Sequence, residues 1–187
     1  MAPQLSYGRH RGPAVGWARP AAVCMLLYPR AGTWHLPLTL RPGHMVAHAD
    51  QISLPGGVIE EDEDSREAAL RELNEELGIP PADVTLLGRL SDLYIFNSNY
   101  LVTPWLAAVD ARPAWKISAD EVAELLEVPL PHLVDPATAA RHLIRRGLLH
   151  FEAPHFAFDG HRIWGATAIM LGELVALISE ITAGQPM

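Results

Sequence analysis

The first half of the chain contains two apolar runs with the composition of β-strands. They span residues 21–29 (AAVCMLLYP) and 33–41 (TWHLPLTLR), and only residues 30–32 (RAG) separate them. Aliphatic and aromatic runs on either side of a glycine-containing segment are typical of two strands joined by a tight turn. The sequence therefore predicts a hairpin. A polar loop at 41–51 and a shorter strand at 52–59, which ends against a pair of glycines, follow it.

A helix is predicted after the glycines. Asp64 or Ser65 provides an N-cap, and Gly78 followed by Pro80 ends the helix after residue 77. Leucines at helical spacing indicate a face that packs on the core. These leucines are Leu70, Leu73 and Leu77.

The second half of the chain contains further patterns that predict strands and helices. An Asp159-Gly160 pair between two strand-like runs is typical of a type I′ hairpin turn. Strands that surround one acidic helix, with a second helix at the end, predict a mixed α/β sandwich. The predicted elements are strands at 84–95 and 100–110, a strand or short helix at 122–130, a helical or irregular segment at 131–146, a hairpin at 155–165 and a helix at about 166–181. Residues 1–18 are expected to be loosely ordered, and residues 19–183 are expected to form a single domain.

Charge is distributed unevenly along this chain of 187 residues, whose net charge is −8. Between Gly57 and Ile79 there are nine acidic and two basic residues, which leaves thirteen acidic and twelve basic residues elsewhere. A local excess of acid indicates a site more than a general solubility device. The chain has no long basic stripe, so we expect no nucleic acid partner.

Cysteine and hydropathy patterns indicate a soluble, cytoplasmic protein. Cys24 is the single cysteine and lies in an apolar run, so a buried thiol is expected and an intrachain disulfide is excluded. The N-terminus lacks the apolar core of a signal peptide. The longest apolar stretch, 163–178, contains Glu173 and is shorter than the ~20 residues that a bilayer requires. We therefore expect a helix packed on the core and no membrane partner.

Three glutamates are predicted to converge on the acidic helix. Glu72, Glu75 and Glu76 are three and four positions apart, so their like charges are neighbours and repel. Divalent cations relieve that repulsion, and carboxylate oxygens suit Mg²⁺ or Mn²⁺. Glycines in front of the helix would let backbone approach a metal or ligand closely. The alternative is a solvated acidic face.

The spacing around these glutamates matches a known signature. Five residues separate Gly57 from Glu63, seven more lead to Arg71, and the segment RELNEELGI (71–79) follows. This pattern resembles the Nudix hydrolase signature GX5EX7REUXEEXGU, in which U is apolar, at every specified position. The resemblance implies a mixed sheet sandwiched between helices and a metal-dependent hydrolysis of a nucleoside diphosphate linked to another moiety.

The resemblance also implies roles for individual residues. The metal ligands of the family correspond to Glu72 and Glu76, with Glu75 as a further ligand and catalytic residue. The carbonyl of Gly56 or Gly57 is a further candidate ligand. Glu63 and Arg71 are expected to orient the helix through an ion pair.

The segment upstream, LTLRPGHMVAHADQISLPGG (38–57), resembles the signature LLTXRSXXLRXHXGQXXFPGG of the coenzyme A pyrophosphatase branch. This similarity, which extends over about residues 20–180, implies that Arg41, His48, Gln51 and the glycine pair bind substrate. Arg41 is suited to bidentate contact with a phosphate. The ordinary alternatives are a surface arginine, a packed histidine and a loop-capping glutamine. The departures from the signature are Pro42 for serine, Met45 for leucine, Val46 for arginine, Asp50 for glycine and Leu54 for phenylalanine.

A general base is expected outside the signature. Similar enzymes often take it from a loop before a later strand, where Glu121 is the first candidate and Glu124 the second. Alternatively, Glu75 alone supports the attacking water. The aromatic residues are interpreted as core residues or as a stacking surface for adenine, and the turn 96–99 is expected at the rim of the cleft. These aromatic residues are Tyr94, Phe96, Tyr100, Trp105 and Trp164.

Together these features predict a Mg²⁺- or Mn²⁺-dependent pyrophosphatase that acts on coenzyme A or acyl-CoA and yields 3′,5′-ADP and 4′-phosphopantetheine or its acyl derivative. ADP-ribose, an NDP-sugar or a dinucleotide is the alternative substrate. A non-catalytic domain that senses a nucleotide is the alternative from a different functional class. Homodimers are common in the family, so the oligomeric state is left open.

Overall fold

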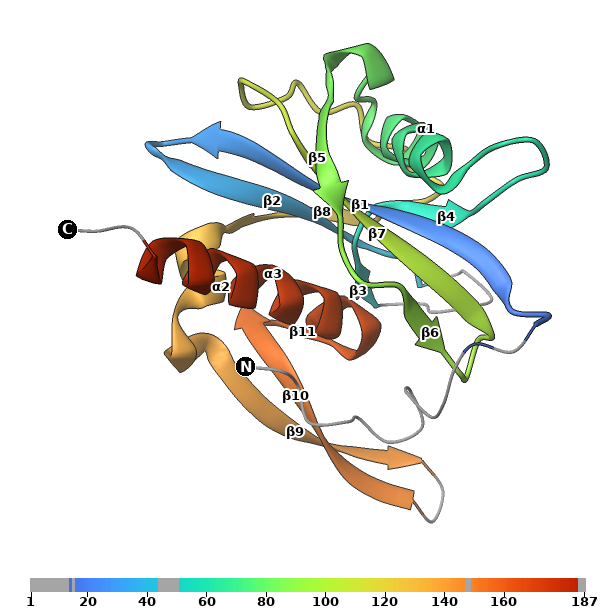
Figure 1. Cartoon of the computed structure of the whole chain (residues 1–187). Coiled ribbons are helices and arrows are strands. Elements are labelled where there is room, and N and C mark those ends of the chain that lie inside the picture. The colour runs from blue at the N-terminus through green and yellow to red at the C-terminus, as the bar shows by residue number, and fades with distance from the viewer. Residues whose placement is uncertain (1–13, 15, 44–50, 147–148, 185–187) are drawn as a thin grey trace.

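The computed structural model describes residues 14, 16–43, 51–146 and 149–184 (Figure 1). The strands are β1 (Arg19–Arg30), β2 (Thr33–Leu40), β3 (Ile52–Ser53), β4 (Gly56–Val58), β5 (Thr85–Arg89), β6 (Leu93–Ile95), β7 (Tyr100–Ala108), β8 (Glu124–Pro129), β9 (Ala139–Arg146), β10 (Leu149–Phe158) and β11 (His161–Trp164). The helices are α1 (Ser65–Leu77), α2 (Leu130–Val134) and α3 (Gly165–Ala183), and 3₁₀ turns lie at Pro81–Asp83 and Pro136–Thr138.

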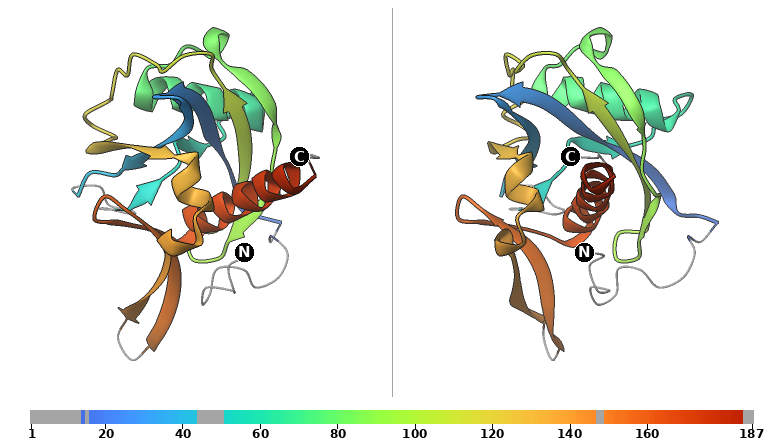
Figure 2. Two further views of the ribbon diagram at one scale, coloured as in Figure 1. Left: turned by 90° about the vertical axis from the view of Figure 1, so that its left-hand side faces the viewer. Right: turned by 60° about the vertical axis from the view of Figure 1, so that its left-hand side comes forward.

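Within these residues, β1 is at the centre of a mixed sheet. The sheet has the order β3-β2-β1-β7-β5, and β4, β6 and β8 pair with β1, β7 and β2. β1 and β7 run parallel, and every other pair in this sheet is antiparallel. A separate sheet of order β11-β10-β9 extends away from the body (Figure 2). The expected α/β sandwich, a mixed sheet with helices on its faces, is confirmed.

Alternate residues of β1 belong to two cores on opposite faces of the sheet. Ala21 and Met25 pack in a cluster with α3, whereas Ala22, Cys24 and Leu26 pack in a cluster with α1. This alternation follows from the two-residue period of side chains along a strand. The Cys24 thiol is buried as expected, and this burial raises its pKa to about 12.

Helix α1 has the predicted limits. The Asp64 carboxylate accepts from the N–H groups of Arg66 and Glu67, while the Glu67 carboxylate accepts from the N–H of Asp64, which completes a capping box. Gly78 ends the helix with a φ of 71°. The buried apolar face differs in part from the prediction, because Leu70 is only half-buried. This face consists of Ala68, Ala69, Leu73 and Leu77.

Several predicted strands have other limits in the structure. The glycines of 52–59 do not end a strand, since Gly56 and Gly57 are part of β4 and pair with β1. The run 84–95 is divided into β5 and β6. Residues 139–146, predicted to be helical or irregular, form β9, which pairs with β10 over eight positions. The predicted β10–β11 hairpin is present, with φ of 47° at Asp159 and 79° at Gly160.

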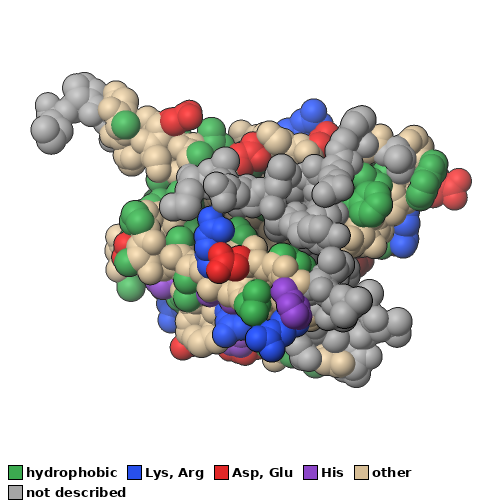
Figure 3. All heavy atoms as spheres, turned by 90° about the horizontal axis from the view of Figure 1, so that it is seen from below, with side chains coloured by type: hydrophobic (Ala, Val, Ile, Leu, Met, Phe, Trp, Pro, Cys, Tyr) green, Lys and Arg blue, Asp and Glu red, His purple; other side chains and the backbone are tan. Residues whose placement is uncertain are grey.

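Helix α3 is slightly longer than the stretch expected from the sequence. By length and composition alone it could cross a membrane, which is weak evidence because core helices meet the same criteria. One face of α3 is buried in the core, and Glu173 on this helix accepts hydrogen bonds from the N–H and hydroxyl of Ser91. In Figure 3, which shows the molecule from below, acidic, basic, histidine and apolar side chains are intermixed on the visible described surface.

Candidate functional site

Strand β4 brings two glycines between β1 and α1. Gly56 has a φ of 154°, and a Cβ there would overlap the backbone of Ala22 and Val23. A Cβ at Gly57 would instead overlap the carboxylate of Glu72. The first glycine therefore allows β4 to approach β1, and the second leaves space for an acidic side chain of α1.

Three carboxylates meet beside these glycines. One oxygen each from Glu72, Glu76 and Glu121 lies within 4.8 Å of the other two. Glu72 and Glu76 are four positions apart on α1, so helical geometry places them on the same side. Glu121 comes from the segment that precedes β8. We call Glu72, Glu76 and Glu121 the carboxylate triad.

Glu76 is the most deeply placed member of the triad, with 3% of its surface exposed. The N–H of Gly56 and the hydroxyl of Thr39 donate to its two carboxylate oxygens, each over 3.4 Å. Burial raises the pKa of Glu76 to about 8, and the Gly56 N–H and Arg41 oppose this rise. Burial also raises the pKa of Glu72, although Arg71 donates a hydrogen bond to it. Burial therefore disfavours the charged form of both Glu72 and Glu76.

Backbone hydrogen bonds bring Glu121 to the end of α1. The N–H of Ser118 donates to the carbonyl of Glu76 over 3.0 Å, and the N–H groups of Glu121 and Val122 donate to the carbonyl of Ser118. The N–H of Ala123 donates to the carbonyl of Leu40 at the end of β2. The segment is thus attached at both ends, which places Glu121 opposite Glu72 and Glu76.

Arg71 forms hydrogen bonds that connect α1 to the segment in front of it. It donates two hydrogen bonds to Glu63, at 2.7 and 3.1 Å, and one of 3.0 Å to the carbonyl of Val58 in β4. The expected ion pair between Glu63 and Arg71 is therefore present. Arg71 also bonds to Glu72 and Glu75, each at 2.9 Å, so a single guanidinium links α1, β4 and the loop between them.

Two predicted acidic residues lie outside the triad. Glu75 was expected to converge with Glu72 and Glu76, but its side chain is 48% exposed and bonds to Arg71. Arg71 is four positions before Glu75, so an ion pair along the helix turns this carboxylate away from the other two. Glu124, the second candidate for the general base, is also outside the triad, and its Oε2 lies 3.3 Å from Nε2 of His161.

The donor set of the triad fits a hard divalent cation. Three carboxylates within 4.8 Å of one another supply oxygen atoms only, which Mg²⁺ and Mn²⁺ prefer. The raised pKa of Glu76 shows that uncompensated negative charge is unfavourable at this position. A cation would compensate that charge, and Glu72, Glu76 and Glu121 are the residues that would hold it.

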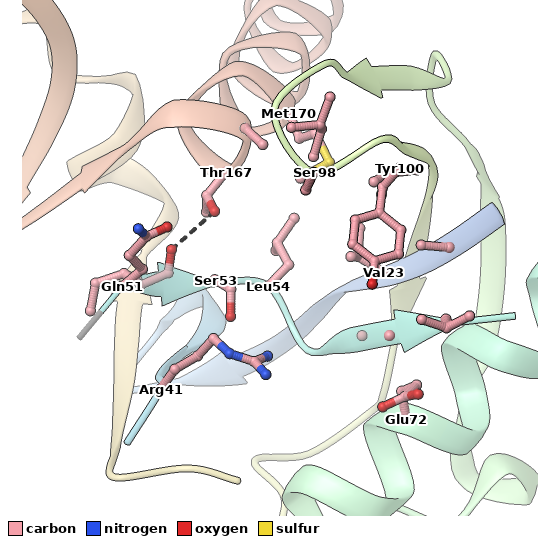
Figure 4. Close-up of a pocket in the computed structure, with 18 of the residues that line it drawn as sticks. Val23, Arg41, Gln51, Ser53, Leu54, Glu72, Ser98, Tyr100, Thr167 and Met170 are labelled. Carbon is pink, nitrogen blue, oxygen red and sulfur yellow. Dashed lines mark hydrogen bonds between the residues drawn. The ribbon is translucent and has the colours of Figure 1, made fainter. Parts of the chain in front are cut away.

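The triad lies in the wall of a cavity of about 690 Å³ (Figure 4). Arg41, Gln51, Gly56 and Gly57, which the sequence predicted to bind substrate, all line this cavity. His48, the other predicted binding residue, lies outside the described residues, as do the departures at 45, 46 and 50.

Arg41 brings a positive charge to the wall of the cavity. The backbone N–H of Arg41 donates to the carbonyl of Gln51. The side-chain Nε of Arg41 is buried and has no hydrogen-bond partner in the described part of the chain. In Figure 4 the guanidinium points into the cavity, and its charge lowers the pKa of nearby Glu76. A buried donor that lacks a partner is costly unless a ligand supplies one.

Sequence patterns did not reveal every wall of the cavity. Asn97, Ser98, Tyr100 and Trp164 line it, in agreement with the expectation that the turn 96–99 forms a rim. Arg19 was not predicted. It reaches the cavity because β1 and β7 run parallel with Arg19 opposite Tyr100, and no local motif marks such a pairing.

Comparison with known proteins agrees with this geometry. The NUDIX domain family matches residues 18–146. An uncharacterized Nudix hydrolase, NudL, from Yersinia pestis (strain Pestoides F) is 34% identical over 145 residues, which cover 77% of this chain and 72% of that protein.

Solved structures share the fold at lower identity. The Nudix hydrolase RenU of M. smegmatis has a TM-score of 0.59 and 17% identity, over 91% of this chain and 89% of that one. An Ap4A hydrolase of C. elegans has a TM-score of 0.58 and 19% identity, over 88% and 99% of the two chains. The family match, the relative and the carboxylates at the Nudix signature agree, and the chain belongs to the Nudix hydrolase family.

Proposed function

We propose that this Nudix hydrolase is a Mg²⁺- or Mn²⁺-dependent pyrophosphatase that cleaves the diphosphate of coenzyme A or acyl-CoA. The products are 3′,5′-ADP and 4′-phosphopantetheine or its acyl derivative. The observation that carries the proposal is the position of Arg41. Its buried Nε, which has no hydrogen-bond partner among the described residues, lies beside the carboxylate triad in the cavity wall, where a diphosphate would lie between cation and guanidinium.

The apolar part of the cavity wall supports a substrate with a long uncharged part. Beyond the triad and Arg41, much of the wall is apolar. Side chains that form this part include Val23, Leu54, Ile95, Val102, Trp164 and Met170. A pantetheine arm and an acyl chain would bury apolar surface against such a wall. The upstream similarity to the coenzyme A pyrophosphatase branch points to the same substrate class.

Each residue of the site has a role in the proposed reaction. The bound cations would neutralise charge on the phosphoryl oxygens and lower the pKa of water. Glu72, Glu76 and Glu121 would hold these cations, and Glu121 would also accept the proton of the water that attacks phosphorus. Arg41 donates to the phosphate oxygens as the P–O bond of the anhydride breaks. Arg71 keeps Glu72 in place.

A side-by-side assay tests the substrate. The purified protein is given coenzyme A, ADP-ribose and NADH separately with Mn²⁺ or Mg²⁺, and products are identified by mass. We expect the highest kcat/KM on coenzyme A, with 3′,5′-ADP among the products. The Glu76→Gln variant is the control for metal-dependent turnover.

The other outcomes are equally informative. A preference for ADP-ribose or NADH would reject the coenzyme A assignment and retain the hydrolase. Tight binding of a nucleotide without turnover of any diphosphate would indicate a sensing domain instead.

A further inference from the structure

The cavity has a second polar end at the start of β1 and β7, away from the triad. Here the guanidinium carbon of Arg19 lies 4.8 Å from the centre of the Tyr100 ring. Arg19 forms no ion pair with any carboxylate of the described residues. In Figure 4 Ser98 lies on the side of the cavity opposite Arg41 and Glu72, and Tyr100 lies between Ser98 and Glu72. An arginine held on an aromatic ring therefore presents a charge that no acid of the described chain neutralises.

The turn that carries Ser98 is firmly fixed. Asn99, with a φ of 55°, accepts a hydrogen bond of 3.0 Å from the Tyr94 hydroxyl and donates one of 3.1 Å to the carbonyl of Trp17. The N–H of Arg19 donates to the carbonyl of Asn99 over 2.8 Å. These bonds tie the turn to the first residues of β1, so the backbone that carries Arg19 and Ser98 is fixed before any ligand arrives.

Ser98 provides a second, independent sign of a ligand. In the described part of the chain, two buried side-chain atoms have no hydrogen-bond partner, Arg41 Nε and Ser98 Oγ, and both residues line this cavity. Arg41 is beside Glu76 and so serves the reacting diphosphate. Ser98 lies at the other end, so its hydroxyl needs a different polar group of the same ligand.

Charge identifies that group. Among the described residues that line the cavity, Arg19 and Arg41 are the basic ones. A coenzyme A substrate carries, in addition to its diphosphate, a phosphate monoester with a charge of about −1.5 to −2 at neutral pH. Arg41 and the carboxylates that would hold the cations are at the diphosphate end, whereas a protein of net charge −8 offers an anion little general attraction. The monoester therefore requires a cation of its own.

We propose that Arg19 and Ser98 form a binding site for a phosphate monoester on the non-reacting nucleoside half of the substrate. This inference rests on the proposed function and deepens it. Arg19 supplies the charge, Ser98 donates a hydrogen bond, and the Tyr100 ring holds the guanidinium in place. The site makes the enzyme select 3′-phosphorylated substrates over their dephosphorylated counterparts.

The kinetic test compares coenzyme A with dephospho-coenzyme A, which lacks only this phosphate. We expect Arg19→Gln to lower kcat/KM for coenzyme A by about tenfold or more, with dephospho-coenzyme A changed by less than about threefold. Arg19→Lys should restore part of the preference because it keeps the charge. The matched control is Arg89→Gln, which removes an exposed arginine outside the cavity and should leave the ratio unchanged. An equal loss on both substrates, or no loss on either, would overturn the inference.

A binding test separates this inference from the proposed function. Calorimetry with 3′,5′-ADP and with 5′-AMP is independent of turnover. The wild-type protein should bind 3′,5′-ADP about tenfold more tightly, and Arg19→Gln should abolish the difference. If the preference is present but coenzyme A is not cleaved, the proposed function fails and the phosphate site stands. If coenzyme A is cleaved and the wild-type protein shows no preference, the phosphate site fails alone.

Discussion

Replacing Glu76 by glutamine should stabilise the metal-free protein while it removes metal-dependent hydrolysis. Glu76 is 3% exposed, and its pKa is raised by burial from 4.5 to about 8. An acid whose pKa is higher in the folded state must take up a proton on folding above pH 4.5. Its contribution to stability is complete below the unfolded pKa and is lost as the pH rises through the folded pKa. Glutamine resembles the protonated side chain at every pH.

The size of the effect follows from the two pKa values. At pH 7 the solution is about 2.5 pH units above the unfolded pKa and still below the folded one, which costs the wild-type protein about 3 kcal/mol of unfolding free energy. Glutamine offers one acceptor oxygen where the carboxylate offers two. The Gly56 N–H donates to one carboxylate oxygen of Glu76 and the Thr39 hydroxyl donates to the other. Glutamine would lose one of these two hydrogen bonds, which reduces the gain in unfolding free energy by about 1 kcal/mol. The net gain is about 2 kcal/mol, equivalent to a rise in Tm of about 4–8 °C.

Urea unfolding in EDTA measures this gain at pH 5, 7 and 8.5. The difference in unfolding free energy between Glu76→Gln and wild type should grow over this range. As the pH rises, the Glu76 carboxyl ionises readily in the unfolded wild-type protein but not in the folded one, and glutamine does not ionise in either state. Glu75→Gln is the matched control, since Glu75 is on the same helix but outside the triad and 48% exposed. Its stability should differ from wild type by no more than about 0.5 kcal/mol.

Excess Mg²⁺ should reverse the order of the two proteins. Wild-type protein binds the cation and gains stability, whereas the glutamine variant gains little. The reasoning is refuted if Glu76→Gln is no more stable than wild type in EDTA at pH 7, with a difference that does not grow with pH. Such a result would mean that Glu76 is ionised in the metal-free protein.

Other positions give further tests of the site and the fold. Gly57→Ala would place a methyl group against the Glu72 carboxylate and displace it. Circular dichroism should show a folded variant, and calorimetry should show Mn²⁺ binding that is at least about tenfold weaker. An unchanged affinity for Mn²⁺ would contradict this geometry. Glu121→Gln should lower kcat on the preferred diphosphate by about 10²-fold or more, whereas Glu124→Gln, outside the triad, should retain it; equal rates would remove Glu121 from the mechanism. Burial opposes ionisation of Glu127, but hydrogen bonds from an arginine, a tyrosine and a tryptophan outweigh it and lower its pKa to about 2. Its contribution is present above the unfolded pKa of 4.5 and lost as the pH falls towards 2, so Glu127→Gln should cost about 2 kcal/mol in urea at pH 6 and much less at pH 3. An equal cost at both pH values would show that the charge is not responsible.

Elements defined by local signals were the ones that the sequence predicted well. The limits of α1 follow from a capping residue, a helical period and a C-terminal glycine, all within fifteen positions of one another. The β10–β11 turn follows from Asp159-Gly160, a pair that accepts positive φ. Strand β9 was missed because its polar sequence AARHLIRR becomes a strand only through pairing with β10. Pairing with β1 likewise turned the glycines of β4 from a strand end into strand residues.

The site shows the same division between local and distant contacts. Spacing along one helix was sufficient to bring Glu72 and Glu76 together. Glu121 was predicted from the position of its loop in similar enzymes, but its approach depends on backbone bonds from Ser118 to α1 and from the next residues to β2. Arg19 had no signal at all, since its place in the cavity depends on the parallel pairing of two strands eighty residues apart in the chain.

The different fates of Glu75 and Glu76 show why a helical cluster does not by itself define a metal site. At about 100° per residue, Glu76 lies about 40° to one side of Glu72 on the helix, and Glu75 about 60° to the other. On the first side are β4 and β2, whose Gly56 N–H and Thr39 hydroxyl both donate to Glu76. On the second side is Arg71, which forms an ion pair with the exposed side chain of Glu75. The sheet therefore selects which helical carboxylate enters the triad, and the loop with Glu121 supplies the third. A cation at this site would depend on the packing of α1 against β4 as much as on the helix that carries the signature.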